Sequence, residues 1–342
     1  MRTVSSAGLS VGLVVGIAAG FNLAALADSN PMMLTPAGAS EFTLSTFVDG
    51  FPTFQSVVGP LGITFPTSGG VMVTDFSGNV RVFATDTDGQ LASAGAIGQN
   101  YGISNAVGLA SSNGNIYLTQ QGAGILAQLN NNGTLNHVLP GSYPAATGIA
   151  TNPVDGTIYV STIGNNVIFK VNPITQVQTP FVNAIADGLA VSGDGKTLYA
   201  AVNNNRILGF DTTTGAEVFD SGPINGGPDG TAIGTFGNLA GKLFVNTNAG
   251  QVVEIDTTTL AQTVLATGGT RGDFITVDPL NHTLLITQTD DILRLTPFNV
   301  PGPVAGAGMP GLLAAFGGLL GWWRRRTRLI AREILARPPS CP

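Results

Sequence analysis

The stretch DGLAVSGDGKTLYAAVNNNRILGFDTTTG, Asp187 to Gly215, decides the fold because its pattern recurs through the chain. Similar units begin at six glycines, and their starts are separated by 46, 40, 40, 42 and 42 residues. The six glycines are Gly62, Gly108, Gly148, Gly188, Gly230 and Gly272. A regular period of this length indicates a solenoid, a propeller or another repeat array.

Each unit has the pattern of short antiparallel strands. In the quoted unit, the Asp194-Gly195 turn separates an apolar run from a second run, Leu198-Tyr199-Ala200. Asp-Gly at such a join is a strong hairpin signal. A third strand, 206–210, ends in a run of threonines that caps a turn, and a weaker fourth strand follows. Four strands in about forty residues are typical of one propeller blade.

The two ends of the repeat array predict a closed ring. The last unit has three strands before Thr296-Pro297, whereas Glu41 to Val48, EFTLSTFV, resembles a fourth strand. Joining these segments would complete the last blade and leave no exposed sheet edge at the closure. We therefore expect an all-β, six-bladed β-propeller over residues 41–299, and an open linear solenoid is the less favoured alternative.

The N-terminus has the pattern of a secretory signal. Arg2 precedes an apolar run from Gly8 to Ala24, and Ala25-Leu26-Ala27 provides a small-x-small cleavage site. We predict a signal peptide at 1–27 and a linker at 28–40. A retained membrane anchor is the alternative, but the run is shorter than the ~20 residues that a spanning helix needs.

The C-terminal region predicts a second contact with the membrane. Val304 to Trp323 is twenty residues long without a charge and is followed by arginines. This length is sufficient for a transmembrane helix, and indole rings and arginines suit its cytoplasmic interface.

The order of these features resembles the PEP-CTERM class of C-terminal sorting signals, here over residues 300–326. The tripeptide is Pro-Gly-Pro rather than Pro-Glu-Pro, and a tail, 327–342, follows, which we expect to be cytoplasmic. The resemblance implies an exosortase-type partner enzyme and export to the envelope, outer surface or medium of a Gram-negative bacterium; a plain C-terminal anchor is the alternative. The residues that carry it are Pro301, Gly302, Pro303, Trp322, Trp323, Arg324, Arg325 and Arg326.

Charge and cysteine content restrict the partners. Residues 28–303 carry 19 acids and 7 bases, a net charge of −12, so we expect no binding to nucleic acid or to anionic lipid head groups. Cys341 is the single cysteine, so an intramolecular disulfide is impossible.

Candidate site residues precede the six repeat glycines, because the first strand of each propeller blade lines the central channel. Two carboxylates and an arginine lie on one arc of these positions and could bind a cation or a polar ligand. A purely structural pairing of Asp187 and Asp229 with Arg271 is the alternative. The six positions are Leu61, Val107, Thr147, Asp187, Asp229 and Arg271.

Two units, ADGLAVSGDGKTLYAAV and GGPDGTAIGTFGNLAGKLFV, resemble blades of the gluconolactonase (senescence marker protein) family and of broader NHL-type propellers. The resemblance implies a divalent ion, calcium or zinc, in the channel. Asp229 matches the family's aspartate ligand, and Asp187 stands where the family has asparagine. The family's first-blade glutamate is absent around Leu61.

Two hypotheses follow. The first is an exported module that binds a surface polysaccharide, a protein or a small ligand, or that has a structural role. The alternative is a metal-dependent, gluconolactonase-like hydrolase. We place His137 and His282 away from the channel, and we interpret Asp86-Thr87-Asp88-Gly89, which begins like a calcium loop without the later glutamate, as a plain turn.

Overall fold

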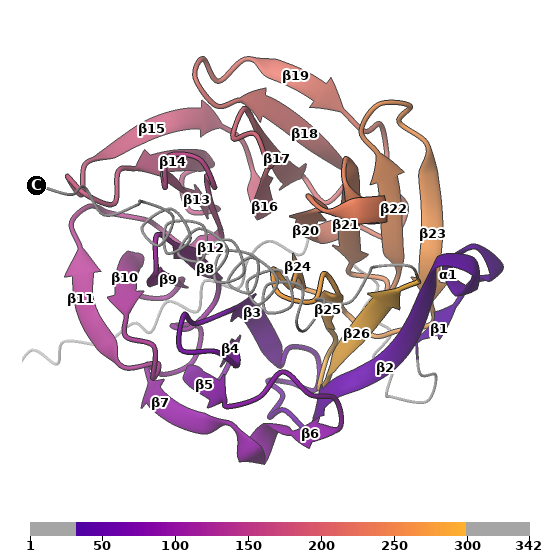
Figure 1. Cartoon of the computed structure of the whole chain (residues 1–342). Helices are drawn as coiled ribbons and strands as arrows, with labels where there is room; N and C mark the ends of the chain where they lie inside the picture. Colours follow the sequence, from indigo (N-terminus) through magenta and orange to yellow (C-terminus); the bar gives the residue numbers. More distant parts are fainter. Residues whose placement is uncertain (1–31, 299–342) are drawn as a thin grey trace, which may run out of the picture. The chain divides into compact units, whose positions relative to one another are not determined.

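The computed structural model describes residues 32–298, and these form a ring of six sheets whose strands pair antiparallel except for β2 (Phe42–Asp49) with β6 (Gln90–Leu91) (Figure 1). The predicted signal peptide, sorting signal and C-terminal helix lie outside the described residues. Among residues 32–298, no helix is long and apolar enough to cross a membrane.

Blades 2 to 4 are built from consecutive strands, as the repeat predicts, and in blade 1 only β6 is missing from the run. Blade 1 contains β3 (Pro60–Thr64), β4 (Val71–Asp75), β5 (Asn79–Phe83) and β7 (Ala96–Asn100). Blade 2 contains β8 (Leu109–Ser112), β9 (Asn115–Gln120), β10 (Ile125–Leu129) and β11 (Leu135–Leu139). Blade 3 contains β12 (Ala146–Thr151), β13 (Ile158–Thr162), β14 (Val167–Val171) and β15 (Gln178–Asn183). Blade 4 contains β16 (Ala186–Val191), β17 (Thr197–Val202), β18 (Arg206–Asp211) and β19 (Glu217–Asp220).

The last two blades each carry a strand from the N-terminal part of the described chain. Blade 5 contains β20 (Pro228–Ile233), β21 (Lys242–Thr247), β22 (Val252–Asp256), β23 (Gln262–Thr267) and the added β1 (Met33–Leu34). Blade 6 contains β24 (Ile275–Val277), β25 (Leu284–Thr287), β26 (Ile292–Pro297), β2 (Phe42–Asp49) and the short β6 (Gln90–Leu91). Short 3₁₀ turns occur at Ala92–Ala94 and Gly237–Leu239.

The predicted closure is confirmed. β2 pairs antiparallel with β26, with Phe42 opposite Pro297 and Leu44 opposite Leu295. The outer side of β2 then pairs in parallel with β6 of the loop from blade 1. The first and last parts of the propeller are thus joined through backbone hydrogen bonds.

The expected linker at 28–40 is partly ordered against blade 5, which the sequence prediction missed. β1 pairs with β23, and α1 (Pro36–Glu41) follows it. The Thr35 hydroxyl caps α1 by accepting from the Gly38 amide at 3.1 Å, and it also donates to the Val264 carbonyl at 2.7 Å. A Cβ added at Gly38 would lie 2.0 Å from the Leu265 carbonyl oxygen, so a glycine is required there.

The hydrophobic core lies between neighbouring blades rather than in one central mass. Phe47 of β2 and Phe83 of β5 pack together across the seam between blades 6 and 1, with ring centroids 6.2 Å apart. Phe244 and Leu284 belong to a cluster shared by blades 5 and 6. Because each blade buries its faces against its neighbours, the pattern must repeat until the ring closes.

The repeat glycines hold the first strands together around the ring axis. A Cβ added at Gly148 would lie 1.8 Å from the Asp187 carbonyl oxygen of the next blade, and one at Gly188 would lie 2.1 Å from that of Asp229. In three blades a hydroxyl of the second strand also accepts a hydrogen bond from the amide of the repeat glycine. The same hydroxyl donates to the backbone carbonyl of the residue that precedes the next blade's repeat glycine. These hydroxyls belong to Thr74, Thr119 and Ser161.

Candidate functional site at the ring axis

The inter-blade contacts identify which residue of each blade lies at the axis. The glycine contacts run from Gly62 to the Val107 carbonyl and, in blade 5, from Gly230 to the Asp273 carbonyl. In blade 6 the amide of Phe274 donates to the Thr287 hydroxyl at 2.8 Å, as the repeat glycines do elsewhere. Phe274 therefore stands in the glycine position. We call the resulting set the axial ring: Leu61, Val107, Thr147, Asp187, Asp229 and Asp273.

This result corrects the sixth predicted position by two residues. The sequence placed Arg271 there because Gly272 follows it, but the structure places Asp273 there. Phe274 replaces glycine because its side chain packs on Leu61 and Val107 across the axis. Arg271 nevertheless remains at the site, since its guanidinium lies between two axial carboxylates.

One arc of the axial ring is apolar. Leu61 and Val107 are buried and cluster with Val58, and Phe274 and Phe76 pack against them. Thr147 is also buried and begins the polar arc, with its hydroxyl 3.1 Å from that of Ser161.

The other arc carries three carboxylates around one guanidinium, and we call Asp187, Asp229, Asp273 and Arg271 the axial cluster. Nη2 of Arg271 lies 2.6 Å from Asp273 Oδ1 and 3.6 Å from Asp229 Oδ2. Nε of Arg271 donates to Asn248 Oδ1 at 2.9 Å. The arginine is thus fixed by two acids and an amide.

Asp187 differs from the other two acids because it has no ion pair within the described chain. Its carboxyl is hydrogen-bonded with the Thr147 hydroxyl and the Asp229 carboxyl. Asp229 and Asp273 are buried, whereas Asp187 is half-buried. Asp187 is therefore the member of the axial cluster with an unmatched charge.

Burial and mutual repulsion raise the pKa of all three acids. Burial raises the pKa of Asp187 to about 6, and Asp273 adds to the effect while Arg271 opposes it. The pKa of Asp229 is raised well above its usual value by burial and by the nearby Asp187 and Asp273. The pKa of Asp273 is raised by burial, against the opposing effect of Arg271. With a pKa of about 6, the Asp187 carboxyl is mostly ionised at neutral pH, and its contact with Asp229 is a hydrogen bond when Asp229 carries the proton.

The described donors do not form a ready coordination sphere for a divalent ion. Within residues 32–298, no group of three or more His, Cys, Asp and Glu side chains is arranged to hold a metal. A guanidinium already lies between Asp229 and Asp273. The residues present therefore do not fit a calcium or zinc ion, and elemental analysis of the protein tests the channel ion that the family resemblance implies.

Neither histidine belongs to the axial ring: His137 lies in the outer strand of blade 2, and His282 lies in the turn between β24 and β25. His137 is in β11 and is 3.1 Å from the Gln176 amide, and the ring of His282 stacks on Phe236 with centroids 4.4 Å apart.

Comparisons with known proteins show the fold. No family model matches the chain, and no curated protein matches its sequence. A gluconolactonase from Xanthomonas campestris superposes with a TM-score of 0.61 at 18% identity, over 79% of this chain and 96% of that one. An auxiliary nutrient binding protein from Bacteroides thetaiotaomicron superposes with a TM-score of 0.57 at 11% sequence identity, over 79% of this chain and 77% of that one. A luciferin-regenerating enzyme superposes with a TM-score of 0.55 at 14% sequence identity, over 76% of this chain and 97% of that one. At these identities the likeness establishes the six-bladed architecture and nothing about activity.

Proposed function

We propose that this protein is an exported binding module whose axial cluster takes a small ligand with a positively charged group. Asp187 carries the proposal, because it is a half-buried carboxylate with no ion pair in the described chain. A cationic group would complete the charge balance there, and the apolar arc of Leu61, Val107 and Phe274 would contact the ligand's body.

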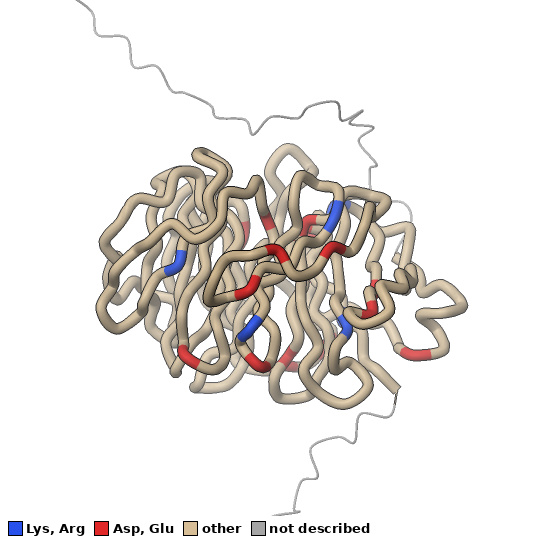
Figure 2. The backbone as a smooth tube through the Cα atoms, turned by 90° about the horizontal axis from the view of Figure 1, so that it is seen from above, with Lys and Arg blue, Asp and Glu red and all other residues tan. Residues whose placement is uncertain are grey.

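The charge of the propeller supports a cationic ligand over an anionic one. Figure 2 shows the acidic and basic residues along the chain. Each described Lys or Arg pairs with a carboxylate or, for Lys170, with the Thr212 carbonyl at 2.6 Å. Among these bases Lys196 alone has a largely exposed side chain, at 79%. The described surface thus offers an anionic ligand little free positive charge.

The terminal segments supply the rest of the proposal. The predicted signal peptide would direct export, and the predicted sorting signal would bring the chain to an exosortase-type enzyme and to the envelope or surface. There the propeller could meet a polysaccharide, a protein or a small ligand, and an amine-bearing one best matches the axial cluster.

A calorimetric titration tests the binding site. The probe is phenethylammonium, and benzyl alcohol is the uncharged comparison. We expect binding of the ammonium alone, weakened about tenfold or more by Asp187→Asn, because a hydrogen bond to a charged group contributes about 1.5–3 kcal/mol. Asp155→Asn, which removes an exposed carboxylate from a turn of blade 3, is the matched control and should leave affinity unchanged.

The pH dependence has a defined sign. The pKa of Asp187 is raised to about 6, so the binding carboxylate is lost as pH falls through that value. Affinity for phenethylammonium should therefore be lower at pH 5 than at pH 7.5. Equal binding of both probes, or no effect of Asp187→Asn, would contradict the proposal.

A further inference from the structure

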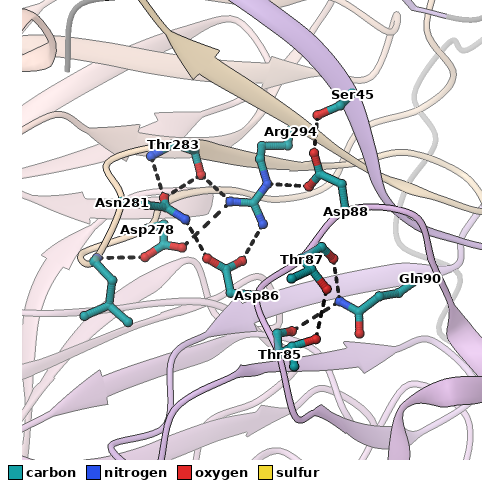
Figure 3. A network of polar contacts seen from close by, with 11 residues as sticks. Ser45, Thr85, Asp86, Thr87, Asp88, Gln90, Asp278, Asn281, Thr283 and Arg294 are labelled. Atoms are coloured by element: carbon teal, nitrogen blue, oxygen red, sulfur yellow. Dashed lines mark hydrogen bonds and ion pairs between the residues drawn. The ribbon is translucent and has the colours of Figure 1, made fainter. Parts of the chain in front are cut away.

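A second group of carboxylates lies at the seam where blade 6 meets blade 1 (Figure 3). The loop between β5 and β6 extends over blade 6 and brings Asp86 and Asp88 to Arg294 of β26. Asp278, at the turn after β24, is the third acid. We call Asp86, Asp88, Asp278 and Arg294 the seam cluster.

Arg294 binds the loop through two of its three side-chain nitrogens and binds blade 6 through the third. Nε donates to Asp88 Oδ1 at 2.7 Å, Nη2 donates to Asp86 Oδ1, and Nη1 donates to the Thr283 hydroxyl at 2.7 Å. The guanidinium also lies over the ring of Phe47, 4.9 Å from its centroid. The arginine side chain is only 5% exposed, so these donors bind protein groups rather than water.

Two further contacts attach the same loop to blade 6. The Asn281 amide donates to Asp86 Oδ2 at 2.5 Å, and the Ser45 hydroxyl of β2 donates to Asp88 Oδ2 at 2.6 Å. The loop therefore contacts β26 and β2, which close the ring, and also the turn after β24.

Asp278 is the incomplete member of the seam cluster. Its side chain is fully buried, and Oδ1 accepts from the Leu280 amide at 2.8 Å. Oδ2 has no hydrogen-bond donor and lies 4.0 Å from Arg294 Nη1, while its carboxyl faces that of Asp86. Two ionised carboxylates cannot hydrogen-bond to each other, so this contact becomes a bond when one of them carries a proton.

We propose that the loop between β5 and β6 is a pH-dependent latch on the ring closure, fastened when Asp278 is protonated against Asp86 and loosened when it is ionised. Ionisation would place a third negative charge beside a single guanidinium in a buried site. The facing charged groups are Asp86, Asp88 and Arg294, and His282, four residues along, stacks on Phe236 instead.

The direction of the pH effect follows from the raised pKa of Asp278. Burial and the adjacent Asp86 raise that pKa from 3.8 to about 7. The closed latch therefore binds the proton more tightly than the open one. Its stabilising contribution is fully present below about pH 4 and is lost as pH rises through about 7.

Hydrogen exchange measured by mass spectrometry on the full chain tests the latch. At pH 8.5 about one chain in thirty would keep the proton, from a pKa of about 7. After correction for intrinsic rates, exchange in residues 84–91 should be several-fold faster at pH 8.5 than at pH 5.5. The corresponding loop of blade 2, Asn130–Thr134, contains no ionisable side chain and should not change.

Asp278→Asn distinguishes titration of this residue from a general loosening. The amide keeps the shape of the neutral acid, so the variant should keep the loop equally protected at both pH values. The proposal is overturned if wild-type residues 84–91 are equally protected at pH 5.5 and 8.5, or if the change persists in Asp278→Asn. The wild-type comparison of the two loops decides the question even if the variant folds poorly.

Discussion

The axial cluster and the seam cluster have the same composition, three aspartates around one arginine, but they differ in how completely their groups are paired. Arg294 is 5% exposed and donates to two acids and a hydroxyl. The Arg271 side chain is 35% exposed, and its Nη2 lies 2.6 Å from Asp273 Oδ1 but 3.6 Å from Asp229 Oδ2. The seam cluster joins distant parts of the chain, whereas the axial cluster leaves Asp187 with a charge for a ligand.

The largest difference between the two clusters should appear when the arginines are removed. Arg294→Met would leave the buried Asp278, the partly buried Asp86 and the more exposed Asp88 beside one another without a cation. We expect it to lower the free energy of unfolding by about 3–5 kcal/mol, as is typical of breaking a buried ion pair. Urea denaturation at pH 7 measures the loss.

Arg206→Met is the control for that experiment, because the Arg206–Asp220 pair is about as close, at 2.7 Å, but is 34% and 38% exposed. Its removal should cost no more than about 1 kcal/mol. Equal losses for the two variants would show that Arg294 does not hold the seam.

Arg271→Met should lower the free energy of unfolding by about 1–3 kcal/mol, which is less than the loss expected for Arg294→Met. The loss is smaller because solvent reaches the axial cluster and its acids can take up protons. The same urea experiment compares the two. The loss should grow from pH 5 to pH 8 as the axial acids ionise without their counter-ion. A loss as large as that of Arg294→Met would contradict the distinction between the clusters.

Asp229→Asn should make the unfolding free energy less sensitive to pH. The pKa of Asp229 is higher in the folded state than in the unfolded chain, where it is about 4. Ionisation of Asp229 therefore lowers the free energy of unfolding of the wild type progressively as pH rises above about 4. The variant should therefore gain stability relative to wild type between pH 5 and pH 8. Urea denaturation at pH 5 and at pH 8, with Asp155→Asn as the control variant, measures this difference in the free energy of unfolding. If Asp229→Asn instead lost stability relative to wild type between pH 5 and pH 8, the prediction would be contradicted.

The smallest effect is expected for Thr147→Val. The change removes the hydroxyl that contacts Asp187 and Ser161, at a cost of about 1 kcal/mol. Because this hydrogen bond lowers the pKa of Asp187, the pH midpoint of phenethylammonium binding should move upwards. A titration series from pH 5 to pH 8 measures the midpoint, and an unchanged midpoint would remove Thr147 from the site.

The sequence predicts the ring well because its period is local. Each unit shows its own strands, turns and glycine, and EFTLSTFV resembles a fourth strand closely enough to predict the closure that β2 makes with β26. The two-residue strand β1 was missed because Met33–Leu34 has no periodicity and depends on the edge of β23 for its pairing.

The positions of the residues around the ring axis were predicted in part, whereas their role in binding stays a prediction. Thr147, Asp187 and Asp229 precede repeat glycines, and they lie in the axial ring as expected. Asp273 was missed because Phe274 replaces the glycine; the hydroxyl of Thr287, which aligns with Thr74 and Thr119, was the available signal.

The seam cluster could not be found from local patterns. Asp86 and Arg294 are 208 residues apart, and their contact depends on the closure of the ring. The sequence predicts a plain turn at 86–89, whereas the structure places these residues in the loop between β5 and β6, where Arg294 binds both acids.

Elemental metal analysis tests most directly whether the axial cluster is a cation-binding site that works without a resident metal. The full chain and its Asp229→Asn variant would be dialysed against micromolar calcium and zinc and then analysed. The account predicts no bound ion that depends on Asp229, because Arg271 already supplies the positive charge beside it. One ion per chain in the wild type, lost in Asp229→Asn, would contradict it and make the metal-dependent hydrolase the better description.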